Sequence, residues 1–448
     1  MFGFHPKCKK IGLTHLSFDD DLMIFCKGNI ESVVGVLTIL DHFYEISGLK
    51  LNPSKCEIFA AGITLRTIEE LKLITGFHIG ILPVRYLGIP LVTRKLTEKD
   101  WQALIDNIKL KLHHWTGRNL SYTGRLELIR SVLFNVKNYW CRQLVLPASI
   151  LKKVEQLCSR YFWKRADKSA AGARVSWEII CLSKSEGGLG LKNIKSWNRA
   201  CLISLIQKIL AGDGSLWVAW LKAYVFKEHD FWQFRAAANV SWSIGIILKS
   251  RAEALSILSV GSPQVKEIWD LIRSKGQNIS WHKIIWFPLH IPKFSLIAWM
   301  ALLNKLPTRD RLLRMGINTD GICVNCSNSN ETRDHLFSHC SLATDLWNSI
   351  LNLNGMKTTY LSWEDMVSKA CSSWKGRSLL TTILKLSWTA FIYSLWQERN
   401  KRIFQGRRRT IECLLKDVKD VVGIRLRRTN INRLDNTNLR LCKVWGIV

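Results

Sequence analysis

Four side chains that commonly bind metal ions lie close together late in the chain and constrain its fold more than any other feature. Cys323 and Cys326 are followed by His335 and Cys340, with the spacing C-x2-C-x8-H-x4-C. Three thiolates and one imidazole complete a tetrahedral shell around Zn²⁺, and a shell with no open position serves structure and not catalysis. The spacing therefore predicts a compact module with a structural zinc ion. His339 is an alternative ligand, with poorer geometry because it adjoins Cys340.

Three consecutive aspartates lie near the N-terminus, between two short apolar runs. Residues 13–18 and 22–26 flank Asp19, Asp20 and Asp21, a pattern that predicts a β-hairpin of buried strands with an acidic tip. Carboxylates that project together can hold the divalent metal ions that phosphoryl transfer requires. Aspartate is also a common turn former, so the pattern alone leaves a purely structural turn open.

Apolar residues recur at helical spacing over most of the chain beyond residue 96, whereas the first 60 residues suit strands, turns and one helix over 31–47. A second hairpin is expected around the turn 52–54, with residues 56–60 as its strand. Residues 166–173, which are small or charged, form a predicted linker. The expected fold class is therefore mixed: α+β at the N-terminus, then mostly α-helical, with a small zinc-binding module.

The net charge of +30 points to a polyanionic partner, and nucleic acid is the usual one. A basic solvated surface without a specific ligand is the alternative. Most of the 20 tryptophans have aliphatic neighbours at helical spacing, which favours core packing.

The cysteines indicate the cellular compartment. Thirteen cysteines, scattered singly apart from the metal-binding cluster, suit a reducing compartment. The N-terminus has no apolar signal sequence, and the longest uncharged apolar stretch, around 386–396, is too short to cross a membrane. We therefore expect an intracellular protein without a membrane partner.

Several stretches resemble the reverse transcriptases of plant LINE-type (non-LTR) retrotransposons. The segment Phe18-Asp19-Asp20-Asp21 resembles the Phe-Ala-Asp-Asp motif of that family, and the later stretches follow in the family's order. The stretches after residue 290 resemble the zinc-binding domain that follows the polymerase in these elements. The full set of stretches that follow the aspartate motif is Ser47–Lys55 (SGLKLNPSK), Arg85–Leu91 (RYLGIPL), Leu120–Arg125 (LSYTGR), Gly187–Leu191 (GGLGL), Phe294–Trp299, Leu306–Leu312 and Glu331–Phe337.

The resemblance implies roles for particular residues. Asp20 and Asp21 match the two metal-binding aspartates, which would hold magnesium in a competent polymerase, and Lys55 matches a lysine near the phosphates of the incoming nucleotide. Asp19 stands where the family has alanine, and a third carboxylate there adds like-charge repulsion. The fingers and the palm strand with the remaining metal-binding aspartate would lie before Met1. We therefore expect a truncated enzyme that binds RNA, DNA and zinc but is not catalytically competent alone.

Two alternatives stay open: an active polymerase completed by upstream sequence or another chain, and a host-adopted scaffold that uses its tryptophan-rich helices for protein contacts. Nuclear localisation follows from the resemblance alone. Near the zinc module, Lys305, Arg309, Arg311 and Arg314 either contact phosphates or solvate a helix. The resemblance divides the chain into a partial palm (1–92), thumb-like helices (93–165), a helical connector (174–262), the zinc-binding domain (263–352) and a basic helical tail (353–448).

Overall fold

The structure, a computed structural model, describes residues 2–164, 173–212, 214–227, 229–235, 240–259, 261–358, 360–427 and 435–447. These residues form two compact units, each assembled from stretches far apart in the sequence. Unit 1 comprises residues 1–107, 136–151 and 194–273, and unit 2 comprises 108–135, 152–193 and 274–448. The predicted linker at 166–173 lies almost wholly outside the described residues. The limits of the five predicted segments stay a prediction.

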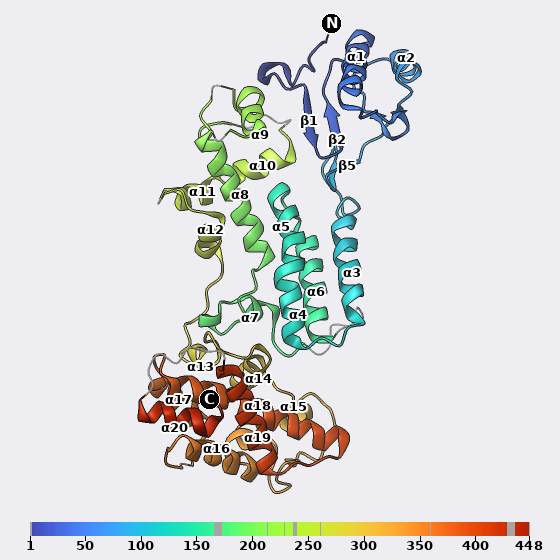
Figure 1. Cartoon of the computed structure of the whole chain (residues 1–448). Helices are drawn as coiled ribbons and strands as arrows, with labels where there is room; N and C mark the ends of the chain where they lie inside the picture. The colour runs from blue at the N-terminus through green and yellow to red at the C-terminus, as the bar shows by residue number, and fades with distance from the viewer. Residues whose placement is uncertain are drawn as a thin grey trace. The chain divides into compact units, whose positions relative to one another are not determined.

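Unit 1 begins with the predicted acidic hairpin. Strands β1 (His15–Phe18) and β2 (Asp21–Ile24) pair antiparallel with Phe18 opposite Asp21, which leaves Asp19 and Asp20 as a two-residue turn (Figure 1). The positive φ of 52° at Asp19 suits such a turn. The strands are not the buried ones that the sequence predicts, because in this two-stranded sheet Phe18 is 61% exposed. Helix α1 (Ile30–Ser47) follows and ends at Gly48, whose φ is 73°.

The predicted second hairpin is wrong. Strand β3 (Glu57–Ile58) pairs in parallel with β4 (His78–Ile79), and α2 (Leu65–Thr75) connects them. Parallel strands need a crossover, which this helix provides, so the turn at η2 (Pro53–Lys55) leads into a small β-α-β arrangement. A further antiparallel pair, β5 (Val84–Tyr86) and β6 (Ile89–Leu91), completes the strands of the described residues, all between 15 and 91.

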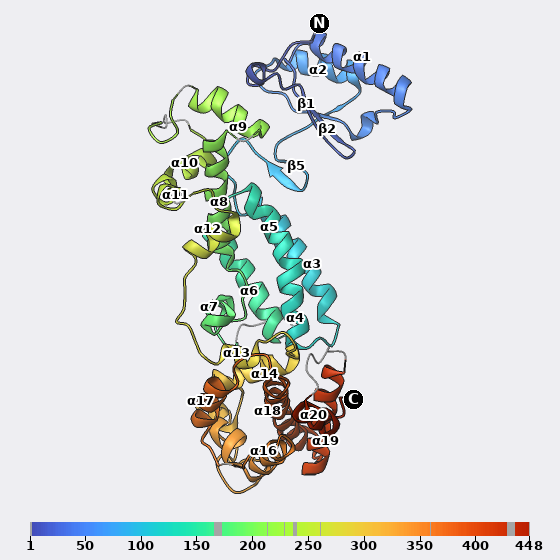
Figure 2. The same ribbon diagram turned by 60° about the vertical axis from the view of Figure 1, so that its left-hand side comes forward.

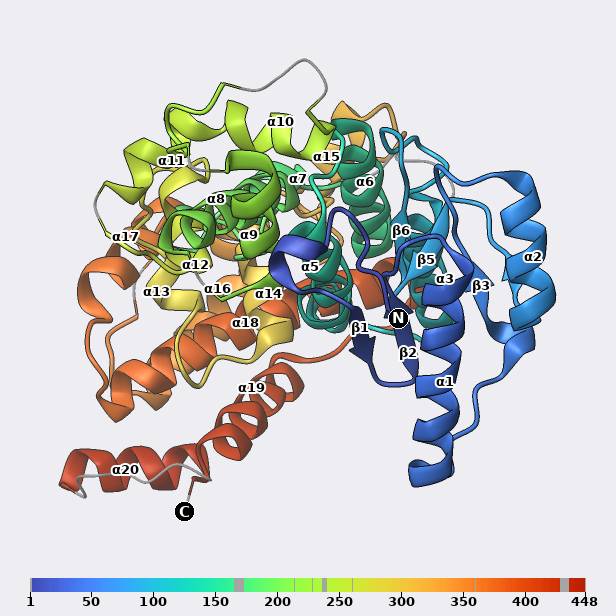
Figure 3. The ribbon, with the colours of Figure 1, turned by 90° about the horizontal axis from the view of Figure 1, so that it is seen from above.

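The rest of unit 1 is helical. Figure 3 shows α8 (Ile194–Ala211) with α11 (Arg251–Leu258) and α12 (Val265–Ile272) close by. Trp269 of α12 packs against Trp197 of α8 with ring centroids 6.3 Å apart and donates a hydrogen bond to Ser196 Oγ at 3.0 Å. The other elements of this region are α9 (Leu216–Trp220), η5 (Leu221–Phe226), α10 (Trp242–Lys249) and, near the N-terminus, η1 (Lys9–Ile11).

Three helices contribute residues to both units: α3 (Gln102–Thr116), α5 (Phe134–Gln143) and α6 (Ala148–Lys164). All three lie beyond residue 96, where the sequence predicts helices. The loop before α3 is fixed by Asp100, which accepts hydrogen bonds from Arg94 Nη1 at 2.7 Å and from the Thr97 backbone N–H at 2.6 Å. Because these bonds favour the ionised carboxylate, with that from Arg94 the strongest, they hold the pKa of Asp100 below its usual range.

Unit 2 is built around α18 (Leu379–Gln405), which lies beside α14 (Pro292–Leu302) in Figures 1 and 2. Ser378 caps the start of α18 by accepting a hydrogen bond from the Thr381 N–H, and Gly406 ends it at a φ of 64°. Trp388 is fully buried and stacks on Trp363 at 5.9 Å, as core packing of the tryptophans predicts. The other elements of this unit are α4 (Tyr122–Leu128), η3 (Ile129–Leu133), α7 (Trp177–Cys181), η4 (Lys184–Glu186), α13 (His282–Ile285), α15 (Arg309–Arg314), η6 (His335–His339), α16 (Ser341–Leu353), α17 (Trp363–Ser373), α19 (Ile411–Leu426) and α20 (Asn436–Trp445).

By length and composition, α18 is apolar enough to cross a membrane, although its uncharged run is shorter than a membrane span. In the structure 83% of its most apolar stretch is buried inside the protein, and core helices that are mostly buried pass the same test of length and composition. A bent pair formed by α8 and the α9–η5 segment passes the same test of composition.

The mixed fold class, with strands near the N-terminus and a mostly helical remainder, is confirmed.

The glycine-rich stretch at 187–191 is a packing platform in unit 2. Gly187 has a φ of 88°, and its carbonyl oxygen accepts a hydrogen bond at 2.8 Å from the indole of Trp299, which is fully buried in α14. A Cβ atom at Gly188 would lie 2.0 Å from the Leu182 carbonyl oxygen. Glycine at this position therefore lets the turn close against the preceding helix.

Candidate metal centre

Cys323 and Cys326 lie on a tight knuckle. An isolated β-bridge joins Ile322 to Asn330, and the Cys323 N–H donates to the Ser329 carbonyl oxygen at 2.7 Å. The chain reverses at Ser327, whose φ is 60° and whose N–H donates to the Cys323 carbonyl oxygen at 2.7 Å. These backbone bonds hold the two cysteines on one short loop.

His335 and Cys340 come from the next structural element. His335 opens the short helical turn η6, and Cys340 ends it as the residue before α16. The Cys340 N–H donates to the His335 carbonyl oxygen at 2.7 Å, which brings the two side chains to the same side of the turn. His339 is exposed and does not belong to the cluster of ligand atoms, so the structure favours His335 over the alternative ligand.

The ligand atoms of Cys323, Cys326, His335 and Cys340 all lie within 4.8 Å of one another. Cys326 Sγ lies 3.2 Å from His335 Nε2. A tetrahedral zinc shell with Zn–S bonds of about 2.3 Å places sulfur atoms about 3.8 Å apart, so the cluster fits that ion closely. Cys323 and Cys340 are fully buried. Four protein ligands leave no position for substrate, and the arrangement suits a structural zinc ion, as the spacing predicts.

The thiols are arranged to lose protons to a metal ion. A hydrogen bond from Cys340 lowers the pKa of Cys323 to about 5, although burial opposes this, and backbone N–H groups of the knuckle add to the effect. The same bond, together with burial, raises the pKa of Cys340. The pair thus shares one proton around one thiolate at neutral pH, and Zn²⁺ would displace that proton.

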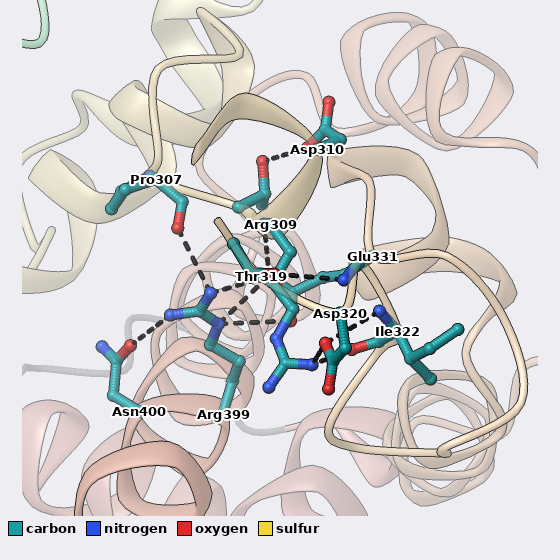
Figure 4. Close-up of polar contacts among 11 residues, drawn as sticks. Pro307, Arg309, Asp310, Thr319, Asp320, Ile322, Glu331, Arg399 and Asn400 are labelled. Atoms are coloured by element: carbon teal, nitrogen blue, oxygen red, sulfur yellow. Dashed lines mark hydrogen bonds and ion pairs between the residues drawn. The ribbon is translucent and has the colours of Figure 1, made fainter. Parts of the chain in front are cut away.

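A buried carboxylate ties this module to α18, in a network shown in Figure 4. Glu331 is fully buried and accepts hydrogen bonds from Arg399 Nη2 at 2.8 Å and from the Arg309 backbone N–H at 2.9 Å. Arg399 also donates to the Pro307 carbonyl oxygen at 3.3 Å. Glu331 lies just before the second pair of ligands, and its bonds join that segment to the start of α15 and to α18.

One helical turn further along α18, Arg402 reaches the knuckle itself. Its Nη1 donates to the Asn325 carbonyl oxygen at 2.7 Å, and its Nε donates to Glu398 Oε1 at 2.8 Å. Glu398 has no exposed side-chain surface and also accepts from Arg409 Nε at 2.9 Å. Burial raises the pKa of Glu398, but the hydrogen bonds from Arg402 and Arg409 outweigh it and lower the pKa overall. Sequence reasoning missed both clamps; the available signal was the pair Glu398-Arg399 directly after an apolar helical run.

The basic residues predicted near the module are largely engaged within the protein. Arg309 bonds to Asp320 and, at 2.7 Å, to the Ile322 carbonyl oxygen (Figure 4). Arg311 Nη1 donates to the Asn304 carbonyl oxygen at 2.5 Å, and Arg314 forms an ion pair with Asp310. Lys305 follows α14, and its backbone N–H donates to the Met300 carbonyl oxygen at 2.7 Å. Contact of these four residues with phosphates stays a prediction.

The predicted polymerase residues lie in unit 1. Asp20 is in the turn of the β1–β2 hairpin, and Asp21 begins β2, both exposed. Lys55 ends η2 in a separate part of the unit's chain. Within the part of the chain that the structure describes, no hydrogen bond or ion pair joins Lys55 to either aspartate, and the group of three or more ligand side chains that can hold a metal ion is the cysteine–histidine cluster. The catalytic assignments of Asp20, Asp21 and Lys55 stay predictions.

Comparison with known proteins agrees with the geometry. Residues 264–347, which contain all four ligands, match the family described as zinc-binding in reverse transcriptase. A curated Arabidopsis thaliana protein, described as a putative ribonuclease H protein, is 28% identical over 129 residues. That match covers 29% of this chain and 21% of the relative. Both similarities support a relation to the reverse transcriptases of retroelements. The family match and the cluster together fit a structural zinc ion.

Proposed function

We propose that this chain is a LINE-type retroelement reverse transcriptase derivative that binds RNA or DNA around a zinc-stabilised module and does not copy RNA by itself. The observation that carries the proposal is the closed cluster of three cysteines and one histidine within the stretch that matches the reverse transcriptase zinc-binding family. The Asp20-Asp21 hairpin supports the assignment to the LINE type, because its sequence resembles the motif of those enzymes.

Nucleic-acid binding is supported by the net charge of +30. A protein that neutralises phosphates releases counterions, so its affinity falls steeply as salt rises. The test is fluorescence anisotropy of labelled RNA and DNA strands with the full zinc-loaded chain, titrated at several salt concentrations. Tight binding with a steep salt dependence supports the proposal. No binding at low salt overturns it and favours the scaffold with protein partners.

The lack of polymerase activity is a separate step of the proposal. Metal-assisted nucleotide transfer needs carboxylates that converge on the metal ions, and within the described residues no third ligand group joins Asp20 and Asp21. We therefore expect no primer extension on an RNA template with magnesium. The control is the Asp20→Asn/Asp21→Asn variant, which should behave like the natural sequence. Extension that this double variant abolishes would show a competent polymerase instead.

The second candidate is an active polymerase completed by upstream sequence or by another chain, which the intact Asp20-Asp21 pair favours. In that case the two aspartates would hold magnesium. An open reading frame in the genomic sequence upstream of Met1 that encodes fingers and the first palm strand would support this candidate. Nuclear localisation belongs to the proposal too, and fluorescence microscopy of the tagged chain tests it.

A further inference from the structure

A groove of about 420 Å³ opens in unit 2, on residues drawn from four separate stretches of the chain. One wall is the LSYTGR motif, which resemblance singled out without giving it a role: Leu120, Ser121, Tyr122, Thr123 and Arg125 all line the groove. The end of α6 supplies Trp163 and Lys164, and α14 and α18 supply the opposite side. The volume is in the range of small-molecule pockets, about 300–1,000 Å³.

The chemistry of the lining is aromatic and cationic. Arg125, Lys164 and Lys293 line the groove, and no aspartate or glutamate among the described residues does. Arg125 Cζ lies 4.5 Å from the centre of the Tyr122 ring, and Lys293 Nζ lies 5.0 Å from the centre of the Tyr393 ring. Tyr393 is itself held rigidly, because it stacks on Phe294 with ring centroids 4.2 Å apart.

Two polar atoms of the lining have no hydrogen-bond partner within the described part of the chain. They are Trp163 Nε1, on a side chain that is 7% exposed, and Thr123 Oγ1. A buried polar atom without a partner is costly, so a ligand that accepts hydrogen bonds there would relieve that cost.

Positive charge continues beside the groove. Arg174 Cζ lies 5.4 Å from the centre of the Tyr122 ring, on which Arg125 also packs. Burial lowers the pKa of Arg311, and repulsion from Arg314 and Arg174 lowers it further, although Asp310 opposes this. Cations gathered in this way are stabilised by an anion, and a chain of phosphates can extend along them.

We propose that the groove holds one nucleotide of single-stranded RNA or DNA, with its base against Tyr122 and Tyr393 and its phosphates at Lys164 and Lys293. Flexible single strands are bound by aromatic faces that stack on bases and by cations that follow the backbone, which is the combination found here. The inference rests on the proposed nucleic-acid binding and names the place where it occurs.

The first test compares two double variants that remove the same charge. Lys164→Gln/Lys293→Gln changes exposed groove residues, and Lys369→Gln/Lys416→Gln changes exposed residues of α17 and α19 in the same unit. Binding of a fluorescent single strand is measured against salt with the full chain, after zinc content and circular dichroism show that each variant is folded. The slope of log affinity against log salt should fall by about 1.4 for the groove variant, since each phosphate contact of a single strand contributes about 0.7. The control variant should keep the natural slope.

The second test separates base stacking from general charge. Tyr122→Leu should weaken binding to a base-bearing strand by about tenfold and leave binding to an abasic strand of the same length unchanged. Ultraviolet cross-linking of strands containing 5-iodouridine or 5-iodo-deoxyuridine should attach peptides with Tyr122 or Tyr393, and the two strands show whether RNA or DNA is preferred.

The outcomes distinguish this inference from the function on which it rests. If the natural chain binds no strand, the proposed nucleic-acid binding fails and the groove assignment fails with it. If the natural chain binds but both lysine variants weaken alike, or cross-links map only outside the groove, then the groove assignment alone is wrong. A peptide that occupies the groove and does not compete with nucleic acid would also overturn it.

Discussion

Arg399 and Glu331 form a buried ion pair, with 2.8 Å between Nη2 and Oε1 and side-chain exposures of 4% and 0%. The two residues are 68 positions apart. Glu331 lies inside the stretch that matches the zinc-binding family, residues 264–347, whereas Arg399 lies on α18 outside it. The metal module of this chain therefore depends on a helix that the family match does not include.

Glu331→Gln should destabilise the protein by about 3–5 kcal/mol, because it leaves the Arg399 guanidinium buried without a counter-charge. The matched control is Glu364→Gln, which removes an ion pair with Arg333 whose glutamate side chain is 68% exposed; such pairs contribute about 0–1 kcal/mol. Urea unfolding of both zinc-loaded variants measures the difference. Equal unfolding midpoints would contradict the structural role of Glu331.

The chain should carry one zinc ion, and Cys340→Ser should lose it, because the buried Cys340 thiolate is one of four ligands. Cys413→Ser, an exposed thiol on α19, should keep it. Acid should weaken binding as the pH falls below 7, since the Cys340 thiol, whose pKa is raised by its bond to Cys323 and by burial, must lose its proton to bind the metal ion. Inductively coupled plasma mass spectrometry after dialysis at each pH measures the content. Full zinc content in Cys340→Ser would overturn the ligand assignment.

Gly188→Ala should destabilise unit 2, because the added Cβ meets the Leu182 carbonyl oxygen at 2.0 Å and backbone must move. Gly124→Ala is the contrasting change. Its Cβ would lie at an ordinary 3.6 Å from the Leu120 side chain, and Gly124 is in helix α4, where alanine is favoured over glycine by up to about 1 kcal/mol. We expect a fall in the melting temperature for the first variant and no fall for the second. The packing account fails if the two variants melt together.

Asp100 should make the stability of the protein depend on pH in acid. Its folded pKa is lower than its unfolded value of about 3.9, so its contribution is present above that value and is lost as the pH falls through the folded pKa. Asp100→Asn should therefore be less stable than the natural sequence at pH 7 and lose less stability between pH 5 and 2. Asp106→Asn, an exposed change in helix α3, which follows Asp100, is the control. Urea unfolding across this pH range checks the result.

The metal cluster could be predicted from sequence because its spacing is local: each pair of ligands lies within one turn or loop, and the ion demands a fixed set of side chains. The hairpin at Asp19–Asp21 was predicted for the same reason, since turn residues between apolar runs are a short-range signal. The sequence predicts a hairpin partner for the strand at 57–58, which is wrong because α2 connects this strand to the parallel strand β4.

The clamps on the module could not be predicted in the same way. Arg399 meets Glu331, and Arg402 meets Asn325, across separations of 68 and 77 residues, for which periodicity carries no information. The predicted basic tail likewise contains α18, whose core position follows from its partners in space more than from its composition. For Arg309 and Arg311 the sequence leaves open whether they contact phosphates or solvate a helix. It does not predict their bonds to Asp320, Ile322 and Asn304, because these depend on turns that bring the groups near.

The bond between Trp299 and the Gly187 carbonyl joins positions 112 residues apart, and this separation has a consequence for synthesis on the ribosome. At about 5–20 residues per second, Gly187 emerges roughly 6–22 s before Trp299 does. During that interval the glycine platform lacks its indole donor, and its apolar residues are open to chaperones or to other nascent chains. Unit 2 is therefore a fold that closes late in translation, and the rate of elongation through residues 187–405 should influence how much of the protein reaches its native state.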